Sequence, residues 1–545
     1  MRDKSGGKAI AAGGFGCVFR PALKCKGKAR ESGISKVLIK KYAVSEMDEI
    51  QKVSNVLTRI PNYTDYFVGI DSTTMCELES LTDADKDGFD TKCSNLTKRG
   101  FNSSNVNSKL NELRSIDSPY GGLEPNGFLN SKQFTLDNFT KLNTSLINLL
   151  NNGVVPMNKL GLFHLDLKGP NILIGDDSKS RIIDWGLSGI QTNSGVIPDA
   201  VKERPFMYNA PFCVCLFQKD FKPFLKKKIN NIVTTLGIPI SSLLEIKEDI
   251  RLGMNEWILK FINLGYQGHH DYIQTILLND VLIDYANYPK PNDVFTSRTY
   301  LKNFIANALT EIVINYTTLS GDFRDIDYFN NVYKHNVDVW GFLSTYYDIL
   351  TLCRSKSTSN KLTNQENAIL SHNIVSLMHK YLFNPNQQIE PIDIKSLTRD
   401  LKILNTISGI LLTPSPGIAI SPVLSAPYAS LSPRASSSVQ IISRPASKAS
   451  SPRASSSRRS PTASSRRSPR VSSRRSSRRS PRVSSRRSPR VSLRRSKTPS
   501  MPALLPVPKK TRKRHVTCDD AKKAKCVAMG KVCNEATGRC LAKKK

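Results

Sequence analysis

The first 45 residues alternate short apolar runs with polar loops, and this pattern predicts β-strands. The segments AIAAGGFGCVF and KVLIKKY are rich in small and β-branched residues. Helical spacing follows at once in SEMDEIQKVSNVLTRI, which ends before a proline and whose apolar positions are Met47, Ile50, Val53 and Leu57. We therefore expect a β-rich beginning and then a helix.

Further along, the pattern becomes mainly helical. Residues 77–118 are polar and irregular, which indicates an insertion at about 77–112. Helical periodicity starts near Asn138, and a compact strand-loop-strand section follows in LGLFHLDLKGPNILIGDDSKSRIIDWG. Amphipathic helices are expected over 216–335 and again over 338–410.

The positive charge belongs to the end of the chain. The 545 residues carry a net charge of +35, and positions 411–545 hold 33 Lys and Arg against 3 acids, a net +30 that leaves about +5 for the first 410 residues. Residues 411–510 are dominated by Ser, Pro and Arg, and the octapeptide SSRRSPRV occurs at 464–471 and again at 484–491. Such a segment has too few large apolar residues to form a core, and we expect it to be disordered.

The front part has the composition of an intracellular globular protein. The sequence has no apolar run of 18 residues, so it predicts no transmembrane helix and no membrane association. The N-terminus lacks the apolar stretch of a signal peptide. A reducing compartment is the default interpretation. Seven of the eleven cysteines are scattered through this part with no metal-like spacing except Cys213-x-Cys215, for which a structural role is favoured.

The most informative motif is HLDLKGPN, residues 164–171, followed thirteen positions later by Asp184-Trp185-Gly186. Phosphoryl transfer needs a carboxylate that orients the attacking hydroxyl and accepts its proton, and Asp166 suits this role. Lys168 suits the contact with the γ-phosphate. Asn171 and Asp184 offer hard oxygen ligands for Mg²⁺.

These residues resemble the H-R-D-L-x-x-x-N and D-F-G signatures of the eukaryotic-type protein kinase superfamily, with Leu165 for Arg and Trp185 for Phe. The resemblance implies a bilobal α+β fold and the cofactors ATP and Mg²⁺. The chain would then comprise a small lobe at 1–124 and a large lobe at 125–410 with a helical insert at 213–336.

An upstream segment resembles the glycine-rich loop that covers the ATP phosphates, with alanine in place of the first glycine. Glycines there let backbone N–H groups approach the phosphates. The residues expected to bind the nucleotide are Ile10, Gly13, Gly14, Phe15, Gly16 and Val18.

Lys40, at the end of Val37-Leu38-Ile39-Lys40, resembles the strand lysine that holds the α- and β-phosphates. Lys41 is the alternative, but strand alternation places Lys40 on the same face as Leu38. Glu49 is the expected helix carboxylate that pairs with Lys40, and Glu46 is its rival.

Other segments resemble family features less closely. IDSPYGG, residues 116–122, resembles the hinge that binds adenine, and RPFMYNAPF, residues 204–212, resembles the end of the activation segment without its usual glutamate. Asp338 resembles the aspartate that braces the catalytic loop. Leu165 replaces the arginine that would bind a phosphorylated activation loop, so phosphorylation of that loop is not expected to be the switch. Such departures also allow an alternative, a pseudokinase scaffold within a nucleic-acid-binding virion protein.

The insert between Pro211 and Asp338 is 126 residues long. Its His269-His270 pair is interpreted as a packing feature because no third metal ligand is spaced nearby. Together with GGFGCVFRP and KHNVDVWGFLSTYYDIL, the insert resembles kinases of nucleocytoplasmic large DNA viruses, such as iridoviruses and mimivirus relatives. This resemblance implies a virion-associated enzyme in the virion or the infected host cell, cytoplasmic with access to the nucleus.

The expected substrates are Ser and Thr hydroxyls of proteins. Small-molecule kinases of related fold generally lack the lysine two residues after the catalytic aspartate, and here Lys168 is present. DLKGPN also resembles serine/threonine rather than tyrosine kinases.

The basic tail predicts contact with polyanions. Residues 451–500 carry 17 positive charges and no acid, which favours nonspecific, salt-dependent binding of nucleic acid over 451–514. Residues 508–514 are interpreted either as a nuclear localisation signal or as more tail. The serines of the basic tail are flanked by Arg and Pro, so self-phosphorylation of the tail is a further hypothesis.

Residues 511–545 form a separate basic piece with four cysteines. Their long spacings disfavour zinc: Cys518, Cys526, Cys533 and Cys540. GKVCNEATGRC resembles a two-cysteine adaptor module attached to proteins of large DNA viruses, and a plain basic end is the alternative.

Overall fold

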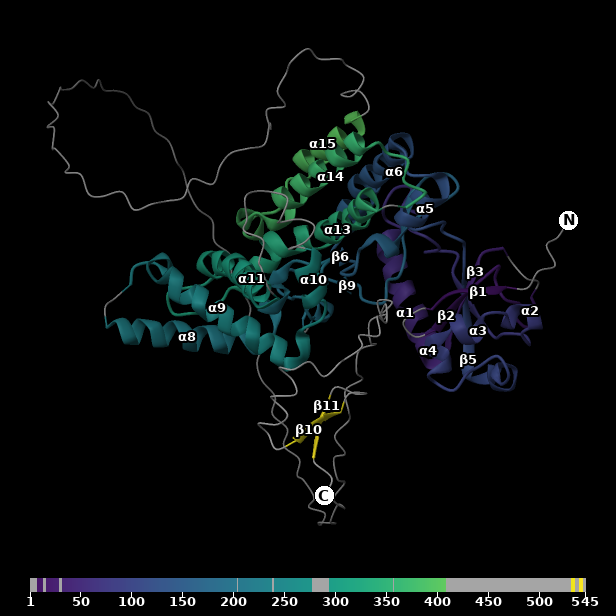
Figure 1. The fold of residues 1–545 in the computed structure, drawn as a ribbon, viewed down its shortest axis with the longest axis horizontal. Helices are drawn as coiled ribbons and strands as arrows, with labels where there is room; N and C mark the ends of the chain where they lie inside the picture. The colour runs from purple at the N-terminus through teal and green to yellow at the C-terminus, as the bar shows by residue number, and fades with distance from the viewer. Residues whose placement is uncertain are drawn as a thin grey trace, which may run out of the picture. The chain divides into compact units, whose positions relative to one another are not determined.

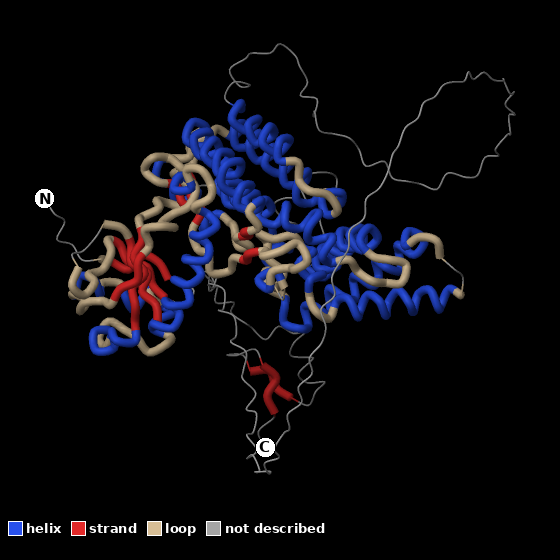
Figure 2. The backbone as a smooth tube through the Cα atoms, turned by 180° about the vertical axis from the view of Figure 1, so that it is seen from behind, coloured by secondary structure: helices blue, strands red, loops and turns tan. Residues whose placement is uncertain are grey.

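The computed structural model describes residues 7–12, 16–28, 32–202, 204–237, 240–276, 294–355, 357–407, 531–534 and 539–542. It is a mixed α/β structure in which a small antiparallel sheet precedes a larger helical part. Figure 2 shows the strands of this sheet gathered in one region, with helices making up most of the remainder. The basic segment 411–510, predicted to be disordered, lies outside the described residues.

The sheet has five antiparallel strands in the order β1-β2-β3-β5-β4. Helix α1 (Lys40–Leu57) follows β3 directly and begins five residues before the predicted helix. The strands are β1 (Lys8–Ala12), β2 (Gly16–Arg20), β3 (Ile34–Ile39), β4 (Thr74–Cys76) and β5 (Leu113–Ser118).

The two faces of the sheet are covered by different segments. The insertion forms short helices α2 (Asp83–Lys86), α3 (Phe89–Lys92) and α4 (Ser94–Thr97), and Phe89, Cys93 and Leu96 pack against Cys17, Phe19 and Val37. On the other face, Leu38 and Ile116 pack with Ala43 of α1. Side-chain alternation along β3 therefore sends odd-numbered residues toward the insertion and even-numbered residues toward α1.

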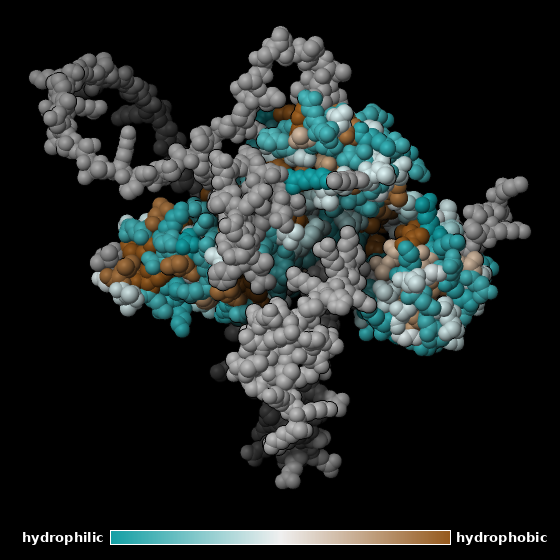
Figure 3. All heavy atoms as spheres, in the orientation of Figure 1, coloured by the Kyte–Doolittle hydropathy of each residue, from teal (hydrophilic) through white to brown (hydrophobic). Residues whose placement is uncertain are grey.

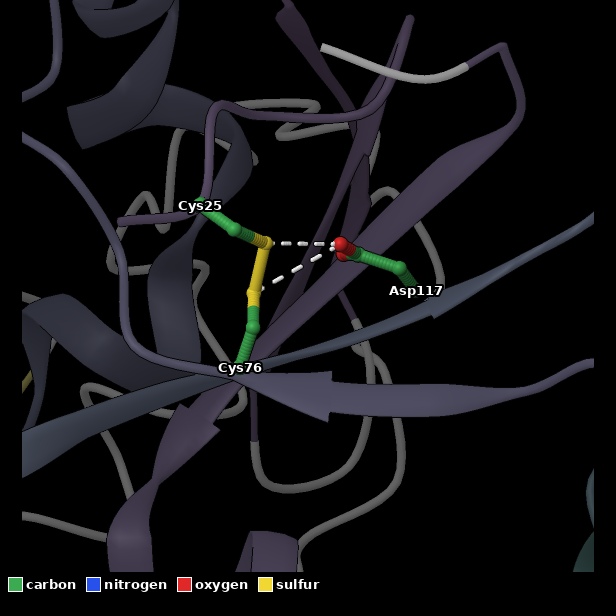
Figure 4. Close-up of side chains that lie close together, drawn as sticks. All are labelled: Cys25, Cys76 and Asp117. Carbon is green, nitrogen blue, oxygen red and sulfur yellow. Dashed lines mark hydrogen bonds between the residues drawn. A yellow bond between two sulfur atoms is a disulfide. The ribbon is translucent and has the colours of Figure 1, made fainter. Parts of the chain in front are cut away.

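Two disulfides join this region. Cys17 of β2 pairs with Cys93 of the insertion, and Cys25 pairs with Cys76 of β4. Figure 4 shows the second pair beside the carboxylate of Asp117. The cysteines look scattered in the sequence because their partners lie 76 and 51 residues away.

A short connection, residues 119–124, leads from β5 into the helical part. Leu123 of this connection and Ile174 of the helical part exchange two backbone hydrogen bonds, at 3.0 and 2.7 Å. Gly122 has φ +110°, and a Cβ there would lie 1.8 Å from the Ile174 carbonyl oxygen, so only glycine fits this approach.

The helical part is built around one continuous core that includes the long buried helix α13. Its helices outside the predicted insert are α5 (Pro125–Lys132), α6 (Leu136–Leu149), α7 (Val155–Lys159), α13 (Lys334–Arg354), α14 (Asn364–Met378) and α15 (Ile394–Ile403). Two small two-stranded pairs lie among them, β6 (Leu162–Phe163) with β9 (Gly189–Ile190) and β7 (Ile172–Ile174) with β8 (Ser180–Ile182).

The segment predicted as a helical insert contains α8 (Phe221–Leu236), α9 (Lys247–Phe261), α10 (His270–Ile276), α11 (Val294–Tyr316) and the short α12 (Asp325–Tyr328). In Figure 1, α8 and α9 extend away from the sheet, on the opposite side of the helical core. Figure 3 shows a hydrophobic patch at their outer end. Exposed hydrophobic residues of this segment include Leu236 at the end of α8, Leu244 in the turn before α9 and Leu252 of α9.

A separate unit covers residues 419–545, of which only a hairpin is described. Strands β10 (Lys531–Asn534) and β11 (Arg539–Ala542) pair in antiparallel fashion, and their register places Cys533 opposite Cys540. Cys518 and Cys526 lie outside the described residues.

Candidate functional site

Asp338 of α13 positions the loop that carries Asp166, and the Asp338 side chain is completely buried. Its two carboxylate oxygens accept backbone hydrogen bonds from His164 and Leu165, each at 2.8 Å. Asn158 donates a third bond at 2.7 Å. These charge-assisted bonds hold the loop as the sequence led us to expect.

Asp166 is 7% exposed, and both of its carboxylate oxygens are engaged. Lys168 Nζ lies 2.8 Å from Oδ2, and Asn171 Nδ2 donates to Asp166 O at 2.8 Å. Asn209 Nδ2 donates to the other carboxylate oxygen at 3.0 Å and to Leu167 O at 3.1 Å. The three predicted catalytic residues are thus brought together, with Asn209 as an unpredicted fourth.

Asp184 follows β8 and turns back toward the same loop. Its backbone has φ +68°, and Leu165 has φ +62°, both in the left-handed region that L-residues seldom adopt. His164 Nε2 donates to Ile183 O at 2.9 Å, which ties the two turns together. Strained backbone of this kind is typical of functional sites, where surrounding contacts hold it in place.

Trp185 fills the space behind Asp184. Its ring lies 4.9 Å from that of His164 and 5.8 Å from that of Phe67, so one line of rings joins the sheet-side segment to the Asp166 loop. Its indole N–H is buried and has no hydrogen-bond partner among the described residues.

The lysine that faces this site is Lys36 rather than Lys40. Lys36 Nζ forms an ion pair with Glu46 Oε1 at 2.6 Å, and the two side chains are 23% and 22% exposed. Glu49, the predicted partner, lies beside Gly186 and Asp184 instead. Lys40 is exposed and lies toward Glu77, whose pKa is lowered by Lys26, Arg114 and, more weakly, Lys40.

This difference from the sequence-based prediction has a local cause. The alternation argument places residues 36, 38 and 40 on one face, but β3 ends at Ile39 and Lys40 is already the first residue of α1. A helical residue no longer follows the strand period, so the argument holds only for Lys36 and Leu38. Similarly, Glu46 rather than Glu49 lies on the part of α1 that contacts β3.

The charges of this group are mutually dependent. Burial alone would lower the pKa of Lys36, but Asp184, Glu46 and Glu49 outweigh it and raise the pKa. The pKa of Glu49 is raised, first by burial and then by Glu46. The ammonium of Lys36 therefore lies within the field of Asp184, which belongs to the helical part.

The predicted nucleotide-binding loop is only partly described. Gly13, Gly14 and Phe15 lie outside the described residues, between β1 and β2. Ile10 is 44% exposed at a bulge in β1, and Val18 of β2 pairs in register with Lys36. A Cβ on Gly16 would lie 2.1 Å from Val37 O, so this glycine permits the close approach of β2 and β3.

Asn171 and Asp184 have the chemistry of ligands for a hard divalent cation. The amide nitrogen of Asn171 is used by Asp166, which leaves its oxygen as the available ligand atom. Asp184 makes no hydrogen bond to another described residue, so its carboxylate is also available. Two such oxygens fit Mg²⁺, which keeps several waters when proteins bind it.

Besides Lys36, two more residues of the site were missed from the sequence. Asn209 stands in RPFMYNAPF, and Arg204 begins that segment, but neither residue type at these positions signals a contact with the Asp166 loop. Arg204 is 7% exposed and donates to Leu165 O at 2.6 Å. Only the folded path of residues 184–210 brings them to the site.

The remaining candidates behave as structural groups. Cys213 and Cys215 are buried free thiols, and burial raises the pKa of Cys213 to about 12. The His269 ring lies 5.4 Å from that of Tyr208 at a tilt of 35°, and its buried Nδ1 has no hydrogen-bond partner in the part of the chain that the structure describes. Within the described residues, the one cluster with metal-ligand geometry is Cys25, Cys76 and Asp117, whose sulfurs form a disulfide.

The comparisons with known proteins do not identify a family. No protein-family model matches the chain, and no curated protein matches it significantly. None of the helices in the described ranges is long and apolar enough to cross a membrane.

Proposed function

We propose that this protein is an ATP-dependent protein kinase that transfers the γ-phosphate to Ser and Thr hydroxyls, built on a bilobal kinase fold. The sheet with α1 forms the small lobe, and the helical part forms the large lobe. The cofactors would be ATP and Mg²⁺, with Mg²⁺ held by Asn171 and Asp184.

The observation that carries the proposal is the meeting of the two parts of the chain at Lys36 and Asp184. A partly buried lysine on a strand, paired with a helix glutamate at 2.6 Å, lies in the field of an aspartate from the other part. A cation opposite a candidate metal ligand, with Asp166 and Lys168 on the adjoining loop, is suited to binding phosphates.

Each side chain has a role that follows from its contacts. Asp166, held through both oxygens, would orient the attacking hydroxyl and accept its proton. Lys168, 2.8 Å from that carboxylate, lies where it can neutralise charge on the transferred group. Lys36 would hold the phosphates, with Glu46 fixing its ammonium.

The first prediction tests this assignment with two lysines four residues apart. Lys36→Met should lower phosphate transfer from labelled ATP to a basic protein by about 100-fold or more, because it removes a charge that stabilises the transition state. Lys40→Met, the matched control, should stay within about threefold of wild type because its side chain is exposed and lies toward Glu77.

Asp166→Asn provides the second control, since it should abolish transfer while leaving nucleotide binding in place. Equal activity in all three variants and the wild type would contradict the kinase assignment. A loss of activity in Lys40→Met with none in Lys36→Met would favour the sequence-based lysine.

A second function is proposed for the basic tail. Its 17 positive charges over residues 451–500, with no acid, support nonspecific binding of nucleic acid by counterion release. Binding without detectable transfer would favour the alternative function, a nucleic-acid-binding protein on an inactive kinase scaffold.

A further inference from the structure

The segment between Asp184 and Ala210 is fastened to the Asp166 loop by one buried arginine. Arg204 donates from Nη1 to Leu165 O (2.6 Å), from Nη2 to Leu187 O (3.0 Å) and from Nε to Ala200 O (2.7 Å). Its guanidinium thus joins the catalytic loop, the turn after Asp184 and the segment itself.

This arginine has no carboxylate or phosphate partner among the described residues. It is 7% exposed, and burial lowers its pKa, while Tyr333, Asp166 and Asp338 act in the opposite sense. Four acceptors, the three carbonyl oxygens and Met207 Sδ at 3.5 Å, therefore engage this buried cation without an added anion.

On the Asp166 loop, the position where the resembled family has an arginine is occupied by the uncharged Leu165. Leu165 is 2% exposed and packs in the core, so it cannot bind a phosphate group. The cation that connects loop and segment comes from the segment, and it binds a backbone oxygen that is always present.

The insert holds the same segment from the other side. Phe206 N donates to Tyr266 O at 3.1 Å, and His269 N donates to Phe206 O at 2.7 Å. Gly268 has φ +51°, and a Cβ there would lie 2.2 Å from Phe206 O. Phe261 adds an edge-to-face contact with the Phe206 ring at 4.9 Å.

These two attachments lie just before Asn209, which donates to Asp166 Oδ1 at 3.0 Å. The amide of Asn209 can reach the catalytic carboxylate only if the segment follows this path. Displacing it by about 1 Å would break that bond, and misplacements of this size can lower turnover about 100-fold.

We propose that Arg204 and the turn 266–269 of the insert are positioning elements that hold residues 187–209 in the transfer-competent path, so that the segment requires no phosphorylation. This inference rests on the proposed kinase function. It assigns to the insert the task of holding the segment that orients Asp166.

The test uses full-length protein treated with phosphatase. We expect the wild type to retain transfer activity, and the triple variant Ser188→Ala, Thr192→Ala, Ser194→Ala to remain within about twofold of it, since no phosphate is needed. Arg204→Met should lower kcat about 100-fold while the KM for ATP changes less than threefold, because Asn209 loses its position and the nucleotide contacts remain.

Arg204→Lys keeps the charge but has a single ammonium in place of the fork, so it should rescue only a small part of kcat. Gly268→Ala tests the insert separately and should also lower kcat. Amide hydrogen exchange over 187–209 should quicken in each of these variants, with or without activity, and thermal unfolding monitors the fold.

Wild-type protein that is inactive after phosphatase treatment but active when phosphorylated at residues 188–194 would overturn the inference and leave the kinase assignment intact. Arg204→Met with unchanged kcat and unchanged exchange would also overturn it. Absence of transfer in both phosphorylation states would overturn the kinase assignment, and with it the role in transfer given to Arg204.

Discussion

At the scale of single residues, the site depends on carboxylates whose surroundings differ sharply. Asp166 and Asp338 are buried with hydrogen-bond donors on both oxygens. Asp348 of α13 is half-buried against Gly169 of the Asp166 loop and makes no hydrogen bond to a described residue. Burial and the nearby Glu124 raise the pKa of Asp348 to about 7.

This carboxyl makes stability depend on pH. Its folded pKa of about 7 exceeds the ordinary value of 3.8, so the folded state retains the proton and loses stability as pH rises between these values. Asp348→Asn should therefore increase the free energy of unfolding relative to wild type, by on the order of 2 kcal/mol more at pH 8 than at pH 5.

Urea unfolding of both proteins at the two pH values measures this difference. Exposed Asp176→Asn is the matched control and should show no such gain at pH 8. A stability difference for Asp348→Asn that is the same at pH 5 and pH 8 would contradict the prediction.

At the scale of elements, apolar contacts replace a missing charge. Phe212 stands where the resemblance expects a glutamate, and its ring packs on Trp340 at 5.3 Å and on Phe383 at 6.4 Å. Trp340 also donates to Tyr208 O at 3.2 Å. The end of the activation-like segment is therefore anchored to α13 by aromatic packing without an ion pair.

The insertion in the sheet region is anchored covalently. Cys17 and Cys93 join β2 to the α3–α4 region across 76 residues, and both are fully buried. Removing the pair with Cys17→Ala and Cys93→Ala should lower the free energy of unfolding by about 2–4 kcal/mol, because the cross-link restricts the unfolded chain.

Thermal unfolding with and without reductant measures the effect, and alkylation under denaturing, non-reducing conditions verifies the bond. In the variant, Cys25–Cys76 is the one disulfide left among the described residues, and a response to reductant should remain because of it. Wild-type cysteines that are fully alkylated without reductant would contradict the presence of the bond.

At the scale of the whole molecule, charge is divided between two parts of the chain. The first 410 residues carry about +5, and the last 135 carry +30. A near-neutral front part thus precedes a strongly cationic segment rich in serine. Under the proposed kinase function, these serines are the expected phosphoacceptors.

Phosphorylation of the tail should weaken nucleic-acid binding. After incubation with ATP and Mg²⁺, mass spectrometry should find phosphoserine within 451–500, and affinity for duplex DNA should fall because each phosphate cancels positive charge. Before incubation, raising salt from 50 to 200 mM should weaken binding at least about 1,000-fold.

The full-length Asp166→Asn protein is the control and should keep its affinity after the same treatment. Phosphoserine at equal levels in this variant would show that another kinase is responsible. Affinity that is independent of salt would contradict binding through counterion release.

Sequence patterns anticipated those parts of the site whose residues are close together in the chain. HLDLKGPN places Asp166, Lys168 and Asn171 on one loop, because residues so few positions apart in a loop cannot lie far from one another. The brace from Asp338 was anticipated by motif order. Lys36, Asn209 and Arg204 were not, because their roles depend on where β3 ends and how residues 184–210 run.

The amino-acid sequence by itself determined the local order of elements, the polar chemistry of the Asp166 loop and the separation of a basic tail from an apolar-rich front, because periodicity, turn chemistry and charge are properties of neighbouring residues. Tertiary structure alone decided which lysine meets Asp184, which cysteines pair and which arginine reaches Leu165. Those contacts join residues tens to more than a hundred positions apart, and their geometry arises only when the elements pack.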